Sequence, residues 1–173
     1  VITSDMNEFS IDTKFDRIVS IEMFEHMRNY QALLKKVASY LNNNGKLFIH
    51  IFSHEYLVYP FENKNDGDWM AREFFSGGMM PSHKLLLYFQ DNFTIESCWR
   101  LSGSHYEKTS LHWLKKMDLN RLAIIKIFEK TYGVENASVW FQRWRIFFMS
   151  CEKLFGYNNG REWGVSHYRF IKK

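Results

Sequence analysis

The segment from Phe15 to Phe52 constrains the fold of this chain more than any other part of the sequence. It opens with a short β-branched apolar run, Phe15 to Ile21, and closes with a second apolar run, Lys46 to Phe52. Such runs are typical of buried parallel strands. Between them, apolar residues recur at helical spacing from Tyr30 to Leu41,. A strand, a helix and a strand in this order predict a βαβ unit with a right-handed crossover, and hence an α/β fold.

Glycine and proline mark where the regular patterns stop. The run Asn42 to Gly45 is expected to end the helix, with the glycine in a left-handed cap,. From Ser53 to Pro81 glycines and prolines interrupt every periodic pattern. Segments of this length in compact domains are usually lids or binding loops, or else disordered. Six aromatic residues within it favour an ordered lid.

The patterns after residue 81 predict three further helices and two further strands. We expect a short helix near residues 82–91, a strand over 94–101, a helix over 106–132 with a kink near Asp118, a helix over 136–155 and a last strand over 162–171,. The whole chain is interpreted as one partial domain. Its parts are a βαβ core (1–54), a lid loop (55–82), a helix and strand (83–101), a helical cap (102–156) and the last strand (157–173).

Composition narrows the classes of function. Aromatic residues make up 18% of the chain, and large rings fill cores but also line pockets for flat or apolar ligands,. The net charge is +4 and the pI is about 9.0. The lysines and arginines are scattered, with no run longer than two. A nucleic-acid partner is therefore not expected.

Compartment is predicted from cysteines and hydropathy. The two cysteines, Cys98 and Cys151, have no metal-binding or redox spacing, which favours a reducing compartment,. No apolar run approaches the roughly 20 residues of a transmembrane helix, and no signal peptide is recognisable. We expect a cytoplasmic location without a membrane-spanning segment.

Three polar residues follow the first predicted strand. In open α/β sheets, ligands bind beyond the carboxyl ends of the strands. Glu22 and His26 are four residues apart, so they share a face if the segment is helical, and Glu25 lies beside them,. Two carboxylates and an imidazole suit the binding and deprotonation of an amine. The alternative is structural, because acidic residues early in a helix are favoured by its dipole.

A metal site is the competing chemical interpretation. The Glu-x-x-Glu-His sequence resembles carboxylate-bridged metal motifs, and His50 and His54 are further candidate ligands. No His-Glu-x-x-His signature occurs, however. One imidazole beside two carboxylates is a weak metal signal, so we predict no metal.

Longer motifs bear a resemblance to a known family. They are FDRIVSIEMFEHM (Phe15 to Met27), GKLFIH (Gly45 to His50), GSHY (Gly103 to Tyr106) and WFQRW (Trp140 to Trp144). In this order, across the whole chain, they resemble the S-adenosylmethionine-dependent methyltransferases of the cyclopropane-fatty-acid-synthase and coclaurine N-methyltransferase group. The resemblance implies a Rossmann-like class I methyltransferase sheet with a largely helical cap, and methyl transfer from S-adenosylmethionine.

The resemblance also implies residue roles. In the N-methyltransferases, the residues that match Glu22, Glu25 and His26 lie at the substrate amine and act in its binding and deprotonation. In the cyclopropane synthases, the residues that match Glu25, His50 and Tyr106 help to hold a bicarbonate that serves as base. Those lipid enzymes tend to have a small residue in place of Glu22, so its carboxylate favours the amine branch.

Further site residues are expected on the same grounds. Asp5 resembles the residue near the adenine of the cofactor, and Met6 and Ser20 are grouped with it as cofactor-binding. His50, Tyr106, Trp140, Phe141 and Trp144 are expected to bind substrate. The wide apolar face of the last long helix, to which the three aromatic residues belong, is equally typical of a core.

The sequence also departs from the family. It contains no G-x-G-x-x-G, so the cofactor loop and the acidic residue that binds the ribose are expected upstream of Val1,. The chain should then hold about four strands of a seven-stranded sheet, with an apolar edge at Ile18 to Ile21 covered by a second chain. Three functions stay open: an amine N-methyltransferase fragment, a lipid enzyme acting on unsaturated acyl chains, and a non-catalytic fragment.

Overall fold

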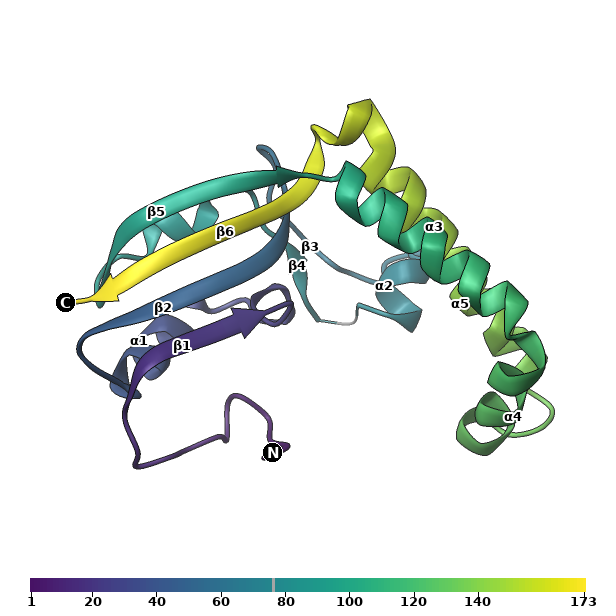
Figure 1. Ribbon diagram of the computed structural model, residues 1–173, viewed down its shortest axis with the longest axis horizontal. Coiled ribbons are helices and arrows are strands. Elements are labelled where there is room, and N and C mark those ends of the chain that lie inside the picture. The colour runs from purple at the N-terminus through teal and green to yellow at the C-terminus, as the bar shows by residue number, and fades with distance from the viewer. Residues whose placement is uncertain (76) are drawn as a thin grey trace.

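The protein is a four-stranded mixed sheet with helices on one face and a helical cap beyond one end (Figure 1). The computed structural model describes residues 1–75 and 77–173. The sheet has the order β1-β2-β6-β5. Its strands are β1 (Phe15–Ile21), β2 (Leu41–His54), β5 (Phe93–Ser102) and β6 (Trp163–Lys172).

The predicted βαβ unit is confirmed. β1 and β2 run parallel, with Ile21 opposite His50, and α1 (Tyr30–Ser39) connects them. The Asn29 side chain caps the helix by accepting a hydrogen bond from the Ala32 N–H at 3.0 Å,. α1 buries its apolar stripe against alternate residues of β2, such as Ile49 and Ile51. His50, between them, therefore projects from the opposite face of the sheet.

The predicted glycine cap is wrong. α1 ends at Ser39, β2 begins at Leu41, and Gly45 lies within that strand. The left-handed residue is Asn44, with φ of 60°. Gly45 is required for another reason, because a β-carbon there would lie 2.8 Å from the Asn42 carbonyl oxygen. The close backbone approach, and not a positive φ, explains this glycine.

The region between β2 and β5 contains short regular elements. β3 (Tyr59–Pro60) pairs antiparallel with β4 (Met79–Met80), and α2 (Trp69–Glu73) lies between them in the chain. The helix expected near residues 82–91 is a single 3-10 turn, η2 (Leu85–Tyr88). Tyr56 and Tyr88 are exposed, whereas several other aromatic residues of this region pack together. One example is the pair of rings of Phe61 and Phe75, 5.3 Å apart.

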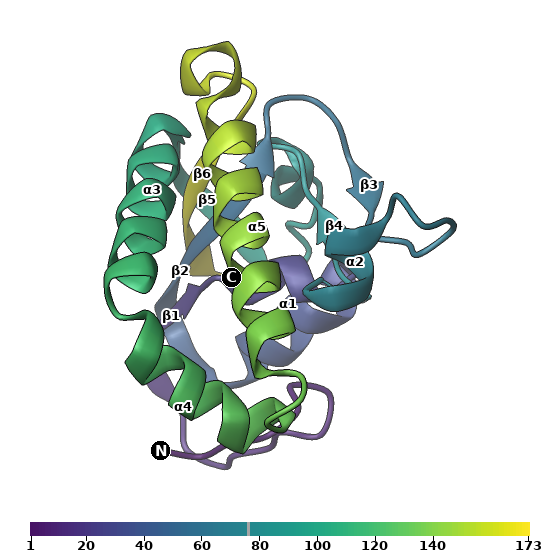
Figure 2. The ribbon, with the colours of Figure 1, turned by 90° about the vertical axis from the view of Figure 1, so that its right-hand side faces the viewer.

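Three helices form the cap: α3 (Ser104–Leu119), α4 (Arg121–Tyr132) and α5 (Ala137–Gly156). The kink predicted near Asp118 is a break at Asn120 that separates α3 from α4. Figure 2 shows α3 and α5 side by side, with α4 across their far ends. The η3 turn (Tyr157–Gly160) then leads into β6.

The outer edge of β1 is open. β1 pairs only with β2 among the described residues, and the Val19 and Ile21 side chains are each 61% exposed. Of the strand, Ser20 alone is buried. The buried environment that the apolar run predicts for this strand is therefore not provided by the described residues. The predicted exposed apolar edge is present.

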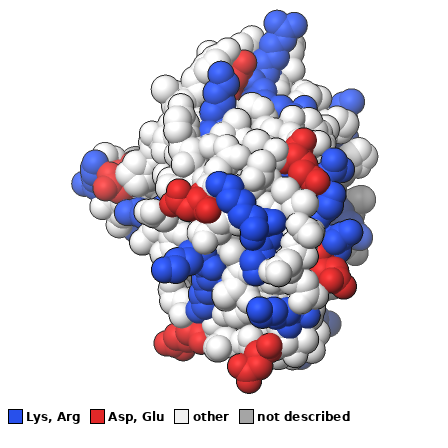
Figure 3. Space-filling view, turned by 90° about the vertical axis from the view of Figure 1, so that its left-hand side faces the viewer, with Lys and Arg blue, Asp and Glu red and all other residues white. Residues whose placement is uncertain are grey.

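The surface carries both signs of charge. On the face shown in Figure 3, basic side chains alternate with acidic and uncharged ones. Glu96, for example, accepts from Lys46 at 2.7 Å and from Arg169 at 3.0 Å. Within residues 1–75 and 77–173, no helix is both long enough and apolar enough to cross a membrane.

Candidate active site

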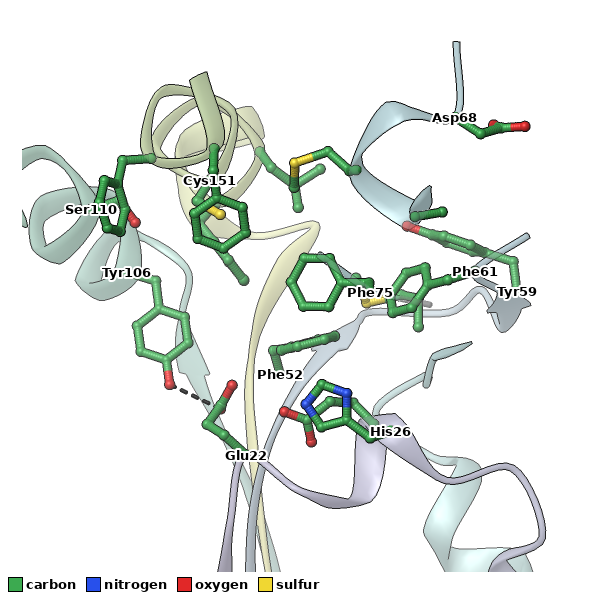
Figure 4. A pocket seen from close by; sticks show the side chains of 18 of the residues that line it. Glu22, His26, Phe52, Tyr59, Phe61, Asp68, Phe75, Tyr106, Ser110 and Cys151 are labelled. Carbon is green, nitrogen blue, oxygen red and sulfur yellow. Dashed lines mark hydrogen bonds between the residues drawn. The ribbon is translucent and has the colours of Figure 1, made fainter. Parts of the chain in front are cut away.

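A cavity of about 570 Å³ lies where the carboxyl ends of β1 and β2 meet the cap (Figure 4). Its base carries polar groups from the segment after β1, and its walls come from β2, the β3–β4 region, α3 and α5. The walls are mainly apolar, with Phe52, Phe61, Phe75, Phe147, Cys151 and Phe155 among them. The site therefore combines a few charged groups with a largely dry surround, which is typical of small-molecule sites.

Glu22 stands at the base of the cavity because of its backbone. It directly follows β1 and has a φ of 50°, a conformation that few residues other than glycine adopt,. Its N–H donates to the His50 carbonyl oxygen at 3.0 Å, which extends the pairing of β1 with β2 by one residue. A left-handed residue held in this way redirects the side chain from the sheet into the cavity. Such positions cluster at functional sites.

The Glu22 carboxylate is held by two side chains from other elements. The Tyr106 hydroxyl on α3 donates to Glu22 Oε1 at 2.9 Å. His50 Nε2 lies 3.0 Å from the same oxygen and 2.8 Å from the Tyr106 hydroxyl. Burial and the Glu22 carboxylate raise the pKa of Tyr106, so its hydroxyl keeps its proton,. Tyr106 and His50 thus hold one oxygen of Glu22 in place from two sides.

Glu25 has the opposite environment. It lies on η1 (Phe24–His26), is 1% exposed, and its Oε2 has no hydrogen-bond partner among the described residues. Burial, followed by the nearby Glu22 carboxylate, raises the pKa of Glu25 to about 8,. The site thus pairs the hydrogen-bonded carboxylate of Glu22 with a buried carboxyl group that holds a proton near neutral pH. Two acidic groups in such different environments are typical of acid–base sites.

His26 lies at the exposed rim of the same cavity. Its ring stacks on Phe75, with centroids 6.4 Å apart and an interplanar angle of 17°. The structure therefore brings together the three predicted catalytic residues, Glu22, Glu25 and His26, with two of the predicted substrate residues, His50 and Tyr106.

The other predicted substrate residues lie elsewhere. Trp140, Phe141 and Trp144 are absent from the lining of the cavity. Trp140 stacks on Tyr132 of α4 with ring centroids 4.2 Å apart, and Phe141 is fully buried. Their contacts hold α4 against α5, which is the core role that the helical spacing equally allowed.

The predicted cofactor residues fit a cofactor only in part. The Ser20 hydroxyl is buried without a hydrogen-bond partner among the described residues, as expected of a group that awaits a ligand,. Asp5 is exposed and accepts from the Asn7 N–H at 2.7 Å, while the Met6 carbonyl accepts from Lys36. No Gly-rich phosphate-type loop occurs in the chain. These residues supply at most one side of an S-adenosylmethionine site.

The residues considered as metal ligands do not form a cluster. Across residues 1–75 and 77–173, no group of three or more His, Cys, Asp or Glu side chains is arranged to hold a metal ion. His54, one of the candidate ligands, uses its Nδ1 to accept from the N–H groups of Tyr56 and Leu57. Its role is to fix the start of the lid region.

Sequence reasoning missed most of the cavity wall. Phe52, Met80, Phe147 and Cys151 line it, yet they follow the same apolar patterns as core residues. Trp144 and Phe147 lie on the same stripe of α5, and their place along the helix decides their role: Trp144 lies nearer the end that packs on Tyr132 of α4, and Phe147 lies nearer the cavity,. The sequence feature that does point to the cavity wall is the density of aromatic residues between Ser53 and Pro81, which favours a lid.

Comparisons with known proteins agree with this geometry. The family model described as mycolic acid cyclopropane synthetase matches residues 1–161. An (S)-coclaurine N-methyltransferase of Papaver somniferum is 38% identical over 176 residues, covering 100% of this chain and 50% of the relative. The crystal structure of a coclaurine N-methyltransferase bound to N-methylheliamine and SAH superposes with a TM-score of 0.88 at 37% identity, covering 96% of this chain and 51% of that one.

A more distant structure shows the same fold. A cyclopropane synthase from Mycobacterium tuberculosis superposes with a TM-score of 0.74 at 21% identity, covering 96% of this chain and 58% of that chain. The chain spans about half the length of the curated relatives it matches.

Proposed function

The chain belongs to the mycolic acid cyclopropane synthetase family, and we propose that the enzyme of which it forms part transfers a methyl group from S-adenosylmethionine to the nitrogen of a small-molecule amine. Coclaurine N-methyltransferases are among its relatives at more than a third identity. Because the chain spans half of their length, the activity, the cofactor and the acceptor are all part of the proposal.

One observation carries the amine assignment. Glu22 places a carboxylate, hydrogen-bonded by Tyr106 and facing His50, at the base of a mainly apolar cavity. In a partly dry site an unpaired charge is costly, so such a carboxylate calls for a cationic partner. A protonated amine on an apolar or aromatic body matches both the charge and the walls.

The residues of this chain then have distinct tasks. Glu22 would hold the protonated amine by its charge and orient the nitrogen. His26 would accept the proton of the amine, as would Glu25 in the fraction that is ionised, since a nitrogen attacks only through its free lone pair,. The aromatic walls at Phe52, Phe61 and Phe75 would exclude water and hold the acceptor in register,. S-adenosylmethionine, when bound, supplies an electrophilic methyl group on a sulfonium.

The lid and cap divisions of the chain belong to the same proposal. Residues 55–82 would cover the acceptor and residues 102–156 would close the far side of the cavity. The remaining half of the enzyme would pair with the open edge of β1 and supply the Gly-rich loop. This pairing would cover the exposed Val19 and Ile21 side chains,.

A lipid enzyme is the second candidate. The walls of the cavity are mostly apolar, as an acyl chain requires. In that case Glu25, His50 and Tyr106 would hold bicarbonate as the base. Glu22 is the observation against it, since a reacting alkene carries no positive charge before methyl transfer.

Acceptor assays on the full-length enzyme separate the two candidates. S-adenosylmethionine labelled in its methyl group is supplied with coclaurine and other amines, or with unsaturated phospholipid, with and without bicarbonate. The proposal predicts label in the amine, independent of bicarbonate. Label in the phospholipid that depends on bicarbonate, with none in the amine, would assign the protein to the lipid branch.

A further inference from the structure

His167 is a polar residue that neither the sequence analysis nor the proposed chemistry uses. It lies on β6 directly opposite His50 on β2, and the two rings are 4.8 Å apart. His167 Nε2 and His50 Nδ1 are separated by 2.9 Å, a hydrogen-bond distance,. His50 is therefore held from both sides, by Glu22 and Tyr106 at Nε2 and by His167 at Nδ1.

The donors in this chain of hydrogen bonds follow from a count of protons. A carboxylate only accepts, and a neutral imidazole has one N–H. Tyr106 donates its proton to Glu22, so its oxygen can only accept from His50. Both contacts of His50 Nε2 therefore require that this nitrogen carry the hydrogen. His50 Nδ1 must then accept, and the donor that faces it is His167 Nε2–H.

We propose that His167 is a positioning residue that fixes the Nε2–H tautomer of His50, and thereby keeps a hydrogen-bond donor on the Glu22 carboxylate that faces a cationic acceptor. The role in catalysis rests on the proposed amine methylation. The tautomer itself rests only on the hydrogen bonds. In this arrangement no proton leaves the network during turnover, because His167 acts by orientation.

The surroundings of His167 suit a neutral donor. Phe48 and Trp99 contact its ring edge to face, with centroids 5.2 Å and 5.3 Å away. The titratable group that faces it from β2 is His50, with Glu22 and Tyr106 beyond, and β5 contributes the uncharged Trp99. Burial, followed by His50, lowers the pKa of His167, which keeps the ring neutral near neutral pH,.

Loss of the His167 donor should reverse the tautomer. His50 Nδ1 would then be free to take the hydrogen and bond to water, leaving a bare Nε2 lone pair against the Glu22 carboxylate. Two acceptors cannot remain at 3.0 Å without a proton between them,. Glu22 would therefore take up a proton at a higher pH than in the wild type, and the amine would lose its counter-charge.

The first test needs no substitution. In the full-length protein that contains this chain, histidine side chains labelled with 15N report by NMR which ring nitrogen carries the hydrogen. The expected result near pH 7.5 is hydrogen on Nε2 for both His50 and His167. Hydrogen on Nδ1 of His50 would overturn the inference whatever the activity of the enzyme.

Substitutions test the dependence of His50 on its partner. His167→Phe keeps a flat ring against Phe48 and Trp99 but removes the donor, whereas His167→Gln keeps an amide N–H. His167→Phe should shift His50 toward the Nδ1–H tautomer, lower kcat/KM for the amine about tenfold, and move the acidic limb of its pH profile upward. His167→Gln should largely restore the His50 tautomer, kcat/KM and the pH profile. His112→Phe, at an exposed position on α3, is the control and should change none of these three quantities.

The outcomes separate this inference from the proposed function. If His167→Phe leaves the His50 tautomer and the acidic limb unchanged, the positioning role is wrong. If the tautomers are as expected but no amine is methylated, the tautomer assignment stands and the proposed function fails, and with it the role of His167 in catalysis. Should His167→Phe fail to fold, the wild-type tautomers and the His167→Gln variant still decide the question.

Discussion

The Tyr106 hydroxyl donates a 2.9 Å hydrogen bond to the Glu22 carboxylate, although the two residues are 84 positions apart in the chain. Tyr106 lies in the first turns of α3 and Glu22 at the end of β1. The bond therefore joins the helical cap to the sheet at the base of the cavity. The Tyr106 donor reaches Glu22 only when these two parts of the fold are docked together.

Removal of this hydrogen bond should weaken the site without destroying it. In Tyr106→Phe the ring still packs edge to face on Phe155, at 5.1 Å, but Glu22 keeps only the His50 donor. We expect kcat/KM for an amine to fall by roughly 10- to 100-fold, the value of one hydrogen bond to a charged group. Steady-state kinetics measure kcat/KM, and an unchanged value would mean that the Tyr106 hydroxyl does not contribute to the site.

The buried Glu25 should make stability depend on pH. Its pKa is raised in the folded protein, so between pH 4.5 and about 8 the unfolded state binds fewer protons than the folded state,. The free energy of unfolding should therefore fall as pH rises through this window and level off above it. In the wild type this fall in the free energy of unfolding should amount to roughly 3–5 kcal/mol. Glu25→Gln has no charge to bury, so the variant should not show it.

Denaturant unfolding at several pH values measures the Glu25 effect as the difference between variant and wild type. Glu8→Gln is the control, because Glu8 is exposed and should give a flat difference. A difference that is equally flat for Glu25→Gln would mean that Glu25 is ionised in the folded protein.

His26 should matter for turnover rather than for folding. It is exposed at the rim of the cavity, where its ring stacks on Phe75. His26→Ala should lower kcat by about 10²-fold or more, as loss of a positioned base typically does, and leave the affinity for S-adenosylmethionine nearly unchanged. Kinetics and calorimetric titration measure the two effects, with His112→Ala as the control. Full activity at neutral pH would make His26 a structural residue.

Gly103 should be intolerant of any side chain. It precedes α3, and a β-carbon there would lie 2.1 Å from the Trp163 carbonyl oxygen and 2.4 Å from that of Phe155. Gly103→Ala should lower the free energy of unfolding by about 1–3 kcal/mol, since the backbone must shift. Thermal unfolding measures it, with Gly67→Ala as control, because there only the Asn65 side chain needs to move. Equal stability of the two variants would contradict this packing.

The sequence was sufficient for the local elements and for the polar residues close in the chain. The βαβ unit followed from periodicity because α1 and β2 bury their apolar positions in a regular pattern. Glu22, Glu25 and His26 were found because they follow β1 directly. His50 and Tyr106 required the family resemblance, since nothing local marks a distant histidine or tyrosine as a partner of Glu22.

The remaining features depend on how distant elements dock. The pairing of His167 with His50 is set by the antiparallel register of β6, which hydrophobic patterning of a last strand does not fix relative to β2,. Trp140 and Trp144 were expected at the substrate, whereas Phe147 and Cys151 line the cavity. All four lie on one stripe of α5, and the packing of α4 against one end of that helix covers Trp140 and Trp144 and leaves Phe147 and Cys151 to the cavity,.

The central claim is that the Glu22 carboxylate holds a cationic acceptor, and Glu22→Gln in the full-length enzyme tests it most directly. The variant keeps the shape of the side chain and removes its charge, so the partly dry site loses its counter-charge. We predict that kcat/KM for amine methylation falls by roughly 10²–10³ while the affinity for S-adenosylmethionine is unchanged, with Glu62→Gln at the outer rim of the cavity as the control,. Amine methylation by Glu22→Gln at the wild-type rate would contradict the claim.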